Sequence, residues 1–248
     1  ETVRLVGEVI GRETRALGMH EILAPNLDVA REPRWGRTEE TFGEDTCLSS
    51  KMAAAIISGE QKDGALDRPD AVASEPKHYC VHGIPEGGTN CSAARAGERE
   101  IRRDYLPVFE AGIREGGACN VMASYNSIDS DVVMCSHKYL TDILKNELGA
   151  QGYARSDWGG IGRIRRLHHL VRDDRDALCL AISNGLDVQG CDLDNQYFEE
   201  TLASLVKEGR LPMERVDDAV RRVLRMKFRL GLFERPYTDE TAWEGEIR

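Results

Sequence analysis

Apolar runs typical of buried strands alternate with segments of helical periodicity along this chain, and this alternation limits its fold more than any other feature. The strand-like runs lie at residues 21–29, 71–79, 119–125, 152–157 and 185–188. Between them, apolar residues recur at three- and four-residue spacing, as on one face of a helix. Strands that alternate with helices form βαβ units around a parallel sheet. The sequence therefore predicts an α/β fold.

The helical periodicity also gives approximate helix positions. Asp45 or Thr46 precedes one helix as a cap, and Pro107 lies inside another, where it predicts a kink. The expected helices cover residues 2–17, 46–59, 98–115, 174–184, 195–208 and 213–230, with one more after Ser136. A closed (β/α)8 barrel needs eight strands. The five runs found here therefore indicate either strands too weak to recognise or an incomplete barrel.

The stretch from Gly152 to Gly160 is the clearest candidate for a reactive site. It reads as a strand that ends in a glycine-rich loop, with Asp157 and Trp158 side by side at the junction. Substrates of β/α folds bind at the carboxyl ends of the strands. A carboxylate there can attack an electron-poor carbon, and an indole offers a flat apolar face for a sugar ring. Asp157 is therefore the candidate nucleophile.

Polar residues follow the other strand-like runs as well, and in a parallel sheet they are expected to face the same end. Their guanidinium, ammonium, imidazole and phenol groups are hydrogen-bond donors suited to sugar hydroxyls. They are Arg37 with Glu40, Lys77 with His78, Met122 with Tyr125 and Asn126, and Asp187.

Each of these residues also has a purely structural interpretation. Asp157 is equally well placed to cap a following helix. Lys77 and His78 fit a surface pair at a strand end, and Arg37 fits an ion pair with the acids around it. Asp28 fits a buried hydrogen-bond acceptor better than a catalyst. His78 and His82 share strand parity, but in an extended chain they lie roughly 13 Å apart, too far to share a metal ion unless the chain turns.

Composition excludes several classes of function. The formal net charge of −10 argues against nucleic acid or an anionic membrane as the main partner, and no apolar run approaches the roughly 20 residues of a membrane span. The seven cysteines are scattered and odd in number, which favours buried free thiols over a disulfide framework. Free thiols point toward a reducing, cytoplasmic compartment, while secreted and periplasmic locations stay open.

Taken together, the strand-end motifs resemble the N-terminal β/α-barrel domain of family 3 glycoside hydrolases, the β-glucosidase and β-xylosidase type. The similarity runs from Ala24 to Tyr237. Four motifs in the family's order carry it: Ala24–Arg37 with Glu40–Asp45, Lys77-His78-Tyr79 with Pro85–Gly88, Val121–Asn126, and Ser156-Asp157-Trp158.

The resemblance implies a retaining exo-acting β-glycosidase that removes terminal β-D-glucosyl residues through a covalent glycosyl-aspartate, with Asp157 as its nucleophile. It implies that Arg37, Lys77 and His78 hold hydroxyls of the terminal sugar. Met122 and Tyr125 would lie beside the nucleophile, and Trp158 would line the site. The fold it implies is a TIM-type (β/α)8 barrel that lacks its first strand or strands. It implies a carbohydrate substrate and neither a metal nor an organic cofactor.

The departures from the family pattern concern what the chain lacks. No Asp-Gly-Pro-like motif precedes the first strand, and the family's usual acid/base glutamate belongs to a second domain. We therefore expect residues 1–235 to form a truncated catalytic barrel and residues 236–248 to begin a linker to an absent second domain. His82 and Glu86 are the internal candidates for the acid. Arg155 stands where the family has an apolar residue, and strand alternation puts it on the same side as Asp157.

Other interpretations stay open. A β-xylosidase of the same family fits the same motifs, and the chain alone could be a non-catalytic, partial sugar-binding domain. Retaining hydrolysis needs two carboxyl groups roughly 5–5.5 Å apart, so we expect the isolated chain to be inactive. A metal hydrolase that uses His78 and His82 is the remaining alternative.

Overall fold

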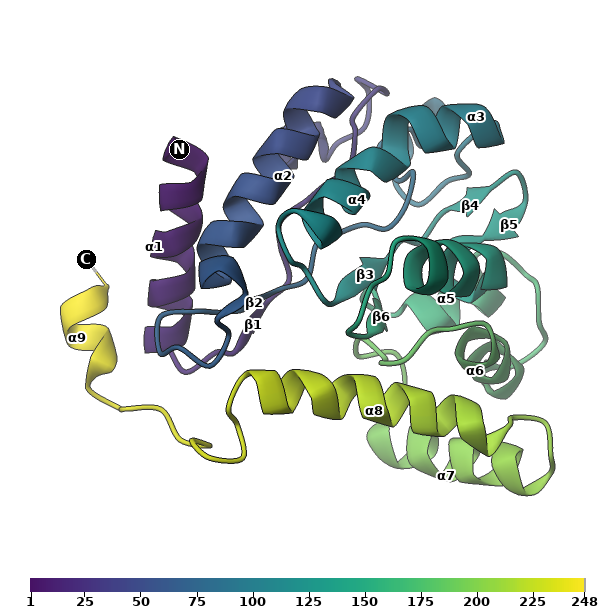
Figure 1. The fold of residues 1–248 in the computed structure, drawn as a ribbon. Helices are drawn as coiled ribbons and strands as arrows, with labels where there is room; N and C mark the ends of the chain where they lie inside the picture. Colours follow the sequence, from purple (N-terminus) through teal and green to yellow (C-terminus); the bar gives the residue numbers. More distant parts are fainter. Residues whose placement is uncertain (248) are drawn as a thin grey trace.

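The computed structural model describes residues 1–247, which form a mixed α/β fold (Figure 1). Its parallel strand pairs join β1 (Glu21–Ile22) to β2 (Ala73–Ser74) and β3 (Val121–Ala123) to β6 (Ala154–Ser156). These strands are short and buried or half-buried, and helices pack around them. The predicted fold class is thus confirmed at the level of α/β.

Isolated parallel pairings connect these strands into one series. Asn26 pairs with Lys77, Tyr79 with Ala123, and Arg155 with Val188. The five predicted runs are therefore neighbours in chain order, which is the order of successive βαβ units. Within residues 1–247 the strands do not make a closed barrel of eight.

Helices occupy the connections between the strands (Figure 1). They are α1 (Thr2–Ala16), α2 (Thr46–Glu60), α3 (Glu98–Glu100), α4 (Leu106–Arg114), α5 (Gly160–Arg166), α6 (Asp174–Ser183), α7 (Asn195–Lys207), α8 (Met213–Arg229) and α9 (Ala242–Glu246). A π-helical segment, η6 (Lys138–Glu147), lies between β3 and β6. The predicted helices are confirmed to within one or two residues, and α5 and α9 were not predicted.

Side-chain caps explain where several helices begin. Asp45 accepts a hydrogen bond from the Leu48 amide at 2.7 Å, which confirms the predicted start of α2. Asp173 and Asp194 cap α6 and α7 in the same way, with bonds of 2.8 and 3.1 Å. Each carboxylate satisfies one of the amides that the first helical turn leaves without a partner.

The expected kink at Pro107 takes the form of a wider turn. The helix starts as α3, continues as a π-helical turn at Ile101–Tyr105 (η4), and resumes as α4 with Pro107 in its first turn. Proline has no amide hydrogen and its ring clashes with the preceding turn, so a regular α-helix cannot pass through it undisturbed.

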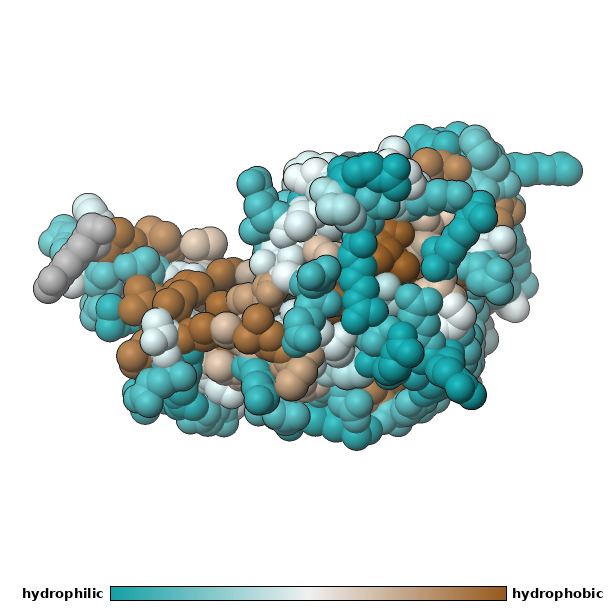
Figure 2. Space-filling view, turned by 90° about the horizontal axis from the view of Figure 1, so that it is seen from above, coloured by the Kyte–Doolittle hydropathy of each residue, from teal (hydrophilic) through white to brown (hydrophobic). Residues whose placement is uncertain are grey.

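The helices α1 and α2 are packed unusually closely, with backbone against backbone. A Cβ atom added to Gly7 would lie 2.3 Å from the Ile56 carbonyl oxygen, and one added to Gly59 would lie 2.2 Å from that of Arg4. Further along, α9 lies beside α1, and Arg12 pairs there with Glu246 at 2.7 Å (Figure 1). Figure 2 shows apolar side chains gathered at this end of the molecule, where Leu5, Val6 and Val9 of α1 are exposed.

The cysteines are all free thiols, as predicted. Those at 80, 91, 119, 135 and 179 are buried, and those at 47 and 191 are exposed. Among residues 1–247, no helix combines the length and the apolar character needed to cross a membrane.

Candidate active site

The series of parallel segments brings polar side chains together at its carboxyl end. His78 follows the Asn26–Lys77 pairing, Tyr125 follows β3, and Asp157 follows β6. Because β3 and β6 pair in register, with Ala123 opposite Ser156, the residues just beyond them leave the sheet at the same level. The predicted meeting of these residues is thus a result of strand register.

Asp28, His78 and Asp157 form a line of contacts. Nδ1 of His78 lies 2.8 Å from Asp28 Oδ2, and Nε2 lies 3.6 Å from Asp157 Oδ2. The side chains of Asp28 and His78 are buried, whereas that of Asp157 is 14% exposed. The outermost group of the line is therefore a carboxylate that solvent can reach.

Burial sets the protonation states in this line. Burial first, and then the charge of Arg37, lower the pKa of His78 to about 3, although Asp157 opposes them. Burial raises the pKa of Asp28 to about 6. Near neutral pH, Asp28 is therefore ionised and accepts the Nδ1 proton of a neutral His78. The Nε2 atom on the side of Asp157 is then left as a hydrogen-bond acceptor.

Arg37 is fixed by a two-pronged ion pair with Glu40, with contacts of 2.7 and 2.8 Å. Asn26 donates a further bond of 3.4 Å to the same carboxylate. The pairing with Arg37 lowers the pKa of Glu40 to about 2, although burial opposes this shift. The same pairing raises the pKa of Arg37, with smaller contributions from Asp28 and Asp157. The ion-pair interpretation of Arg37 is confirmed, and its charge also acts on the two aspartates.

Tyr125 lies between Asp157 and α5. Its hydroxyl donates to the Trp158 carbonyl oxygen at 2.7 Å. Burial first, and then the charge of Asp157, raise the pKa of Tyr125, so the phenol stays protonated and can donate. On the other side of the ring, the guanidinium carbon of Arg163 lies 4.3 Å from the ring centroid, within the range of a cation–π interaction.

The loop that carries Asp157 is held by hydrogen bonds to its neighbours. Ser156 is bonded to Asp192, whose other carboxylate oxygen accepts from the Ile161 amide at 2.5 Å. The helix α5 begins after Gly159, whose φ of 67° suits glycine. Among residues 1–247, the Asp157 carboxylate accepts a backbone amide only from Trp158, at 2.6 Å, and α5 has no side-chain cap. The interpretation of Asp157 as a helix cap is therefore wrong.

Three predicted site residues lie around this group without a side-chain bond to it in the described part of the chain. Met122 is buried in β3, and Lys77 is half-buried at the pairing with Asn26. Trp158 is 72% exposed and lines an open pocket of about 490 Å³ together with Arg163 and Cys191. The site is therefore open on the side of Trp158.

Of two neighbouring residues, Asp187 was expected at the site and lies elsewhere, and Arg155 makes its ion pairs in another cluster. Arg155 pairs with Glu75 at 2.9 Å and with Glu21, in a cluster of its own. Asp187 accepts from the Ala154 amide at 2.9 Å, at the start of β6, and so lies at the opposite end of that strand from Asp157. Neither residue belongs to the candidate site.

The internal candidates for an acid are poorly placed. His82 is fully buried, with Nδ1 3.1 Å from the Asn126 side-chain oxygen and an Nε2 atom that has no partner within residues 1–247. Glu86 is paired with Arg95 at 2.8 Å on the surface. The described residues contain no group of three potential metal ligands, so the metal alternative has no site there.

The sequence did not indicate Arg163 or Asp192 as neighbours of the site. It indicated Asp28 only as a buried structural acceptor. One weak signal pointed to Arg163. It follows Asp157 by six residues, and a helix that begins at Gly160 includes it in its first turn, close to the end of the strand. Asp192 lies far from its partner Ser156 in the sequence, and no spacing rule connects them.

Comparison with known proteins gives a consistent result. The family described as "Glycosyl hydrolase family 3 N terminal domain" matches residues 1–226. The lysosomal beta glucosidase of Dictyostelium discoideum is 35% identical over 98% of this chain and 30% of its own length. A beta-xylosidase of Formosa agariphila is 33% identical over 94% of this chain and 33% of its own length.

Solved structures agree with these sequence matches. The beta-glucosidase from Listeria innocua, in complex with isofagomine, superposes with a TM-score of 0.94 at 32% identity, over 100% of this chain and 34% of that one. The chain thus spans about a third of the relatives that it matches. On the match over residues 1–226, it belongs to glycosyl hydrolase family 3, as part of the N-terminal domain of that family.

Proposed function

We propose that this chain carries the nucleophile of a retaining exo-acting β-glucosidase, and that Asp157 is that nucleophile. The observation that carries the proposal is the position of its carboxylate, open to solvent and 3.6 Å from the buried His78. The relatives are beta-glucosidases and beta-xylosidases, so a β-glycosidic substrate is the common element.

The proposed reaction has two steps. A carboxylate oxygen of Asp157 attacks the anomeric carbon, the bond from that carbon to the leaving oxygen breaks, and an acid gives that oxygen a proton. Water then cleaves the glycosyl ester, which restores the carboxylate and releases the sugar with retained configuration. Asp157 acts as nucleophile, and the acid comes from another part of the enzyme.

The proposed sugar contacts follow from the donors and acceptors around Asp157. Nε2 of His78 accepts from a hydroxyl, while Arg37 and Lys77 donate to others. Met122 and Tyr125 close the site beside the nucleophile. Trp158 offers its exposed ring to the leaving group. Arg37 is already fixed by Glu40, which reduces the entropy lost when it binds a hydroxyl.

The acid and the remainder of the barrel are proposals about the whole enzyme. We place the five parallel segments within a (β/α)8 barrel over residues 1–235, followed from residue 236 by a linker to a second domain that carries the acid/base. On this basis the isolated chain is inactive. Robust hydrolysis by the 248-residue chain would contradict the placement of the acid elsewhere.

The decisive experiment uses the complete enzyme and an aryl β-glucoside. Asp157→Gly should lower kcat by roughly 10⁴-fold or more, a loss typical of a missing nucleophile. Added azide should restore part of the turnover and give the α-glycosyl azide, because azide attacks from the side that the carboxylate has left. Glu86→Gln is the matched control and should keep wild-type rates. Wild-type turnover in Asp157→Gly, or rescue without the α-azide, would remove Asp157 from this role.

The second candidate is a β-xylosidase, because a beta-xylosidase of Formosa agariphila is also 33% identical to this chain. The ratio of kcat/KM on aryl β-xyloside to that on aryl β-glucoside decides between the two. A ratio above one would identify the enzyme as a β-xylosidase and would not affect the assignment of Asp157 as the nucleophile.

A further inference from the structure

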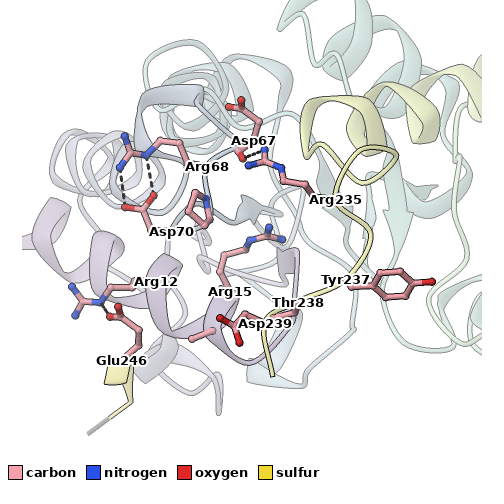
Figure 3. Close-up of a pocket in the computed structure, with 12 residues that line it drawn as sticks. Arg12, Arg15, Asp67, Arg68, Asp70, Arg235, Tyr237, Thr238, Asp239 and Glu246 are labelled. Carbon is pink, nitrogen blue, oxygen red and sulfur yellow. Dashed lines mark hydrogen bonds and ion pairs between the residues drawn. The ribbon is translucent and has the colours of Figure 1, made fainter. Parts of the chain in front are cut away.

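A second pocket, of about 490 Å³, lies at the end of α1 (Figure 3). The last turn of α1, the loop before β2 and the C-terminal segment form its walls. Both α1 and that loop lead into the amino ends of parallel strands, whereas the candidate active site lies at the carboxyl ends. The two sites are therefore at opposite ends of the parallel strands.

Arg15 extends into this pocket with buried atoms that have no partner. Its Nε and Nη1 atoms are inaccessible to solvent and make no hydrogen bond among the residues described. A guanidinium stays protonated inside proteins, so it cannot avoid the cost of burial by losing its charge. Burial first, and then the charge of Arg235, lower the pKa of Arg15. Two cations thus face the same space.

Other arginines of the pocket are paired, which sets Arg15 and Arg235 apart. Arg12 contacts Glu246 at 2.7 Å, and Arg68 contacts Asp70 at 2.9 and 3.1 Å. Arg235 donates only to the Asp67 carbonyl oxygen, and in residues 1–247 its guanidinium has no carboxylate partner. Figure 3 shows Arg15 between the segments with no dashed contact to any residue drawn.

Four acids line the pocket. Asp70 and Glu246 are paired with Arg68 and Arg12, which leaves Asp67 and Asp239 as competitors for Arg15. Asp239 uses one oxygen to accept from the amide and hydroxyl of Thr241, at 2.9 and 2.8 Å. Asp67 contributes its backbone carbonyl rather than its carboxylate to Arg235. Neither acid lies within ion-pair distance of Arg15, so within residues 1–247 no carboxylate neutralises this cation.

We propose that Arg15 and Arg235 together bind a phosphate group. The planar fork of each guanidinium matches two oxygens of a tetrahedral oxyanion, and two such forks on one pocket give both charge and orientation. The pocket volume admits inorganic phosphate and also a phosphate carried by a small sugar. The site is remote from Asp157, so binding should stabilise the fold without changing turnover.

The test is a titration of the protein with inorganic phosphate at constant ionic strength, followed by calorimetry and by thermal unfolding. Phosphate should raise Tm in a saturable manner, as any ligand that binds only the folded state does. Arg15→Gln and Arg235→Gln should each weaken binding by about tenfold or more, the loss expected for a charge-assisted hydrogen bond. Arg12→Gln and Arg68→Gln are the matched controls and should bind phosphate within about twofold of wild type.

The variants also report on the unpaired charge itself. In phosphate-free buffer, Arg15→Gln should melt at the same temperature as wild type or higher, since it removes a half-buried charge whose Nε and Nη1 atoms have no partner within residues 1–247. A second titration with a monosaccharide phosphate separates free phosphate from a phosphorylated sugar as the ligand.

Two results would overturn the proposal. One is the absence of saturable phosphate binding, or equal binding by wild type and Arg15→Gln. The other is a Tm of Asp239→Asn below that of wild type, together with a wild-type Tm that phosphate does not change. This result would show that Asp239 pairs with Arg15 in solution.

Discussion

At the scale of single residues, the buried Asp28 sets the orientation of the His78 ring and its tautomer. A carboxylate at 2.8 Å from Nδ1 holds the ring and fixes which nitrogen carries the proton. The sequence indicated Asp28 as a buried acceptor, and this is confirmed, but its partner could not be predicted. The two residues are 50 positions apart, and only the pairing of neighbouring strands brings them together.

Replacing Asp28 by asparagine tests this role. The amide still accepts a hydrogen bond but carries no charge, so the bond to His78 weakens by about half. We expect kcat/KM of the complete enzyme to fall roughly tenfold, since about 1.4 kcal/mol corresponds to a factor of ten.

The stability of the same variant gives the control for that experiment. Asparagine removes a carboxyl group whose pKa burial raises to about 6, so Tm at pH 7 should stay the same or rise. Unchanged kcat/KM would show that Asp28 only supports the fold.

At the scale of elements, sequence patterns placed the long helices well and the strands poorly. Helices α1 and α8 have periodic apolar faces, and α2 has a recognisable cap at Asp45, so local signals suffice. The first strand-like run shrinks to β1 and a single pairing at Asn26, because Pro25 between them has no amide to donate. The helix α5 was not predicted because Gly159, just before it, and Gly160 and Gly162 within it resemble a loop.

The end of α2 gives a pH-dependent prediction through Glu60. Burial raises the pKa of Glu60 to about 7, although Ser74 donates to its carboxyl group at 2.5 Å and opposes the shift. A raised folded-state pKa means that the native protein binds the proton more tightly than the unfolded chain. This contribution to stability is present below about pH 4.5 and is lost as the pH rises through about 7.

Glu60→Gln removes this titration and keeps an acceptor for Ser74. Relative to wild type, it should be neutral near pH 4.5 and more stable above pH 7, by about 3 kcal/mol for 2.5 pKa units. Urea unfolding at both pH values measures the difference. An equal difference at the two pH values would mean that Glu60 is not the titrating group.

At the scale of the whole molecule, a buried ion cluster joins α8 to the sheet. Asp187 pairs with Lys145 at 2.8 Å and with Arg215, and all three side chains are buried or nearly so. The sequence placed Asp187 at the active site because it follows a strand-like run. The partners of the Asp187 side chain depend on where α8 packs against the sheet, and no local sequence pattern specifies that position.

Asp187→Asn should therefore destabilise the protein by about 3–5 kcal/mol, because two buried cations lose their shared partner. Asp218→Asn, which removes a more exposed partner of Arg215, is the control and should cost about 1 kcal/mol or less. Chemical unfolding at pH 7 compares the two. A loss no greater than that of the control would contradict a structural role for this cluster.

The contact of α1 with α2 has a consequence for how this protein can change over generations. Where Gly7 and Gly59 touch the opposite backbone, there is no side chain that could repack to absorb a mutation. Any other residue has to displace a whole helix, and with it the strand that the helix precedes. Substitution of these two glycines is therefore strongly constrained, while the solvent-facing residues of the same helices remain free to vary.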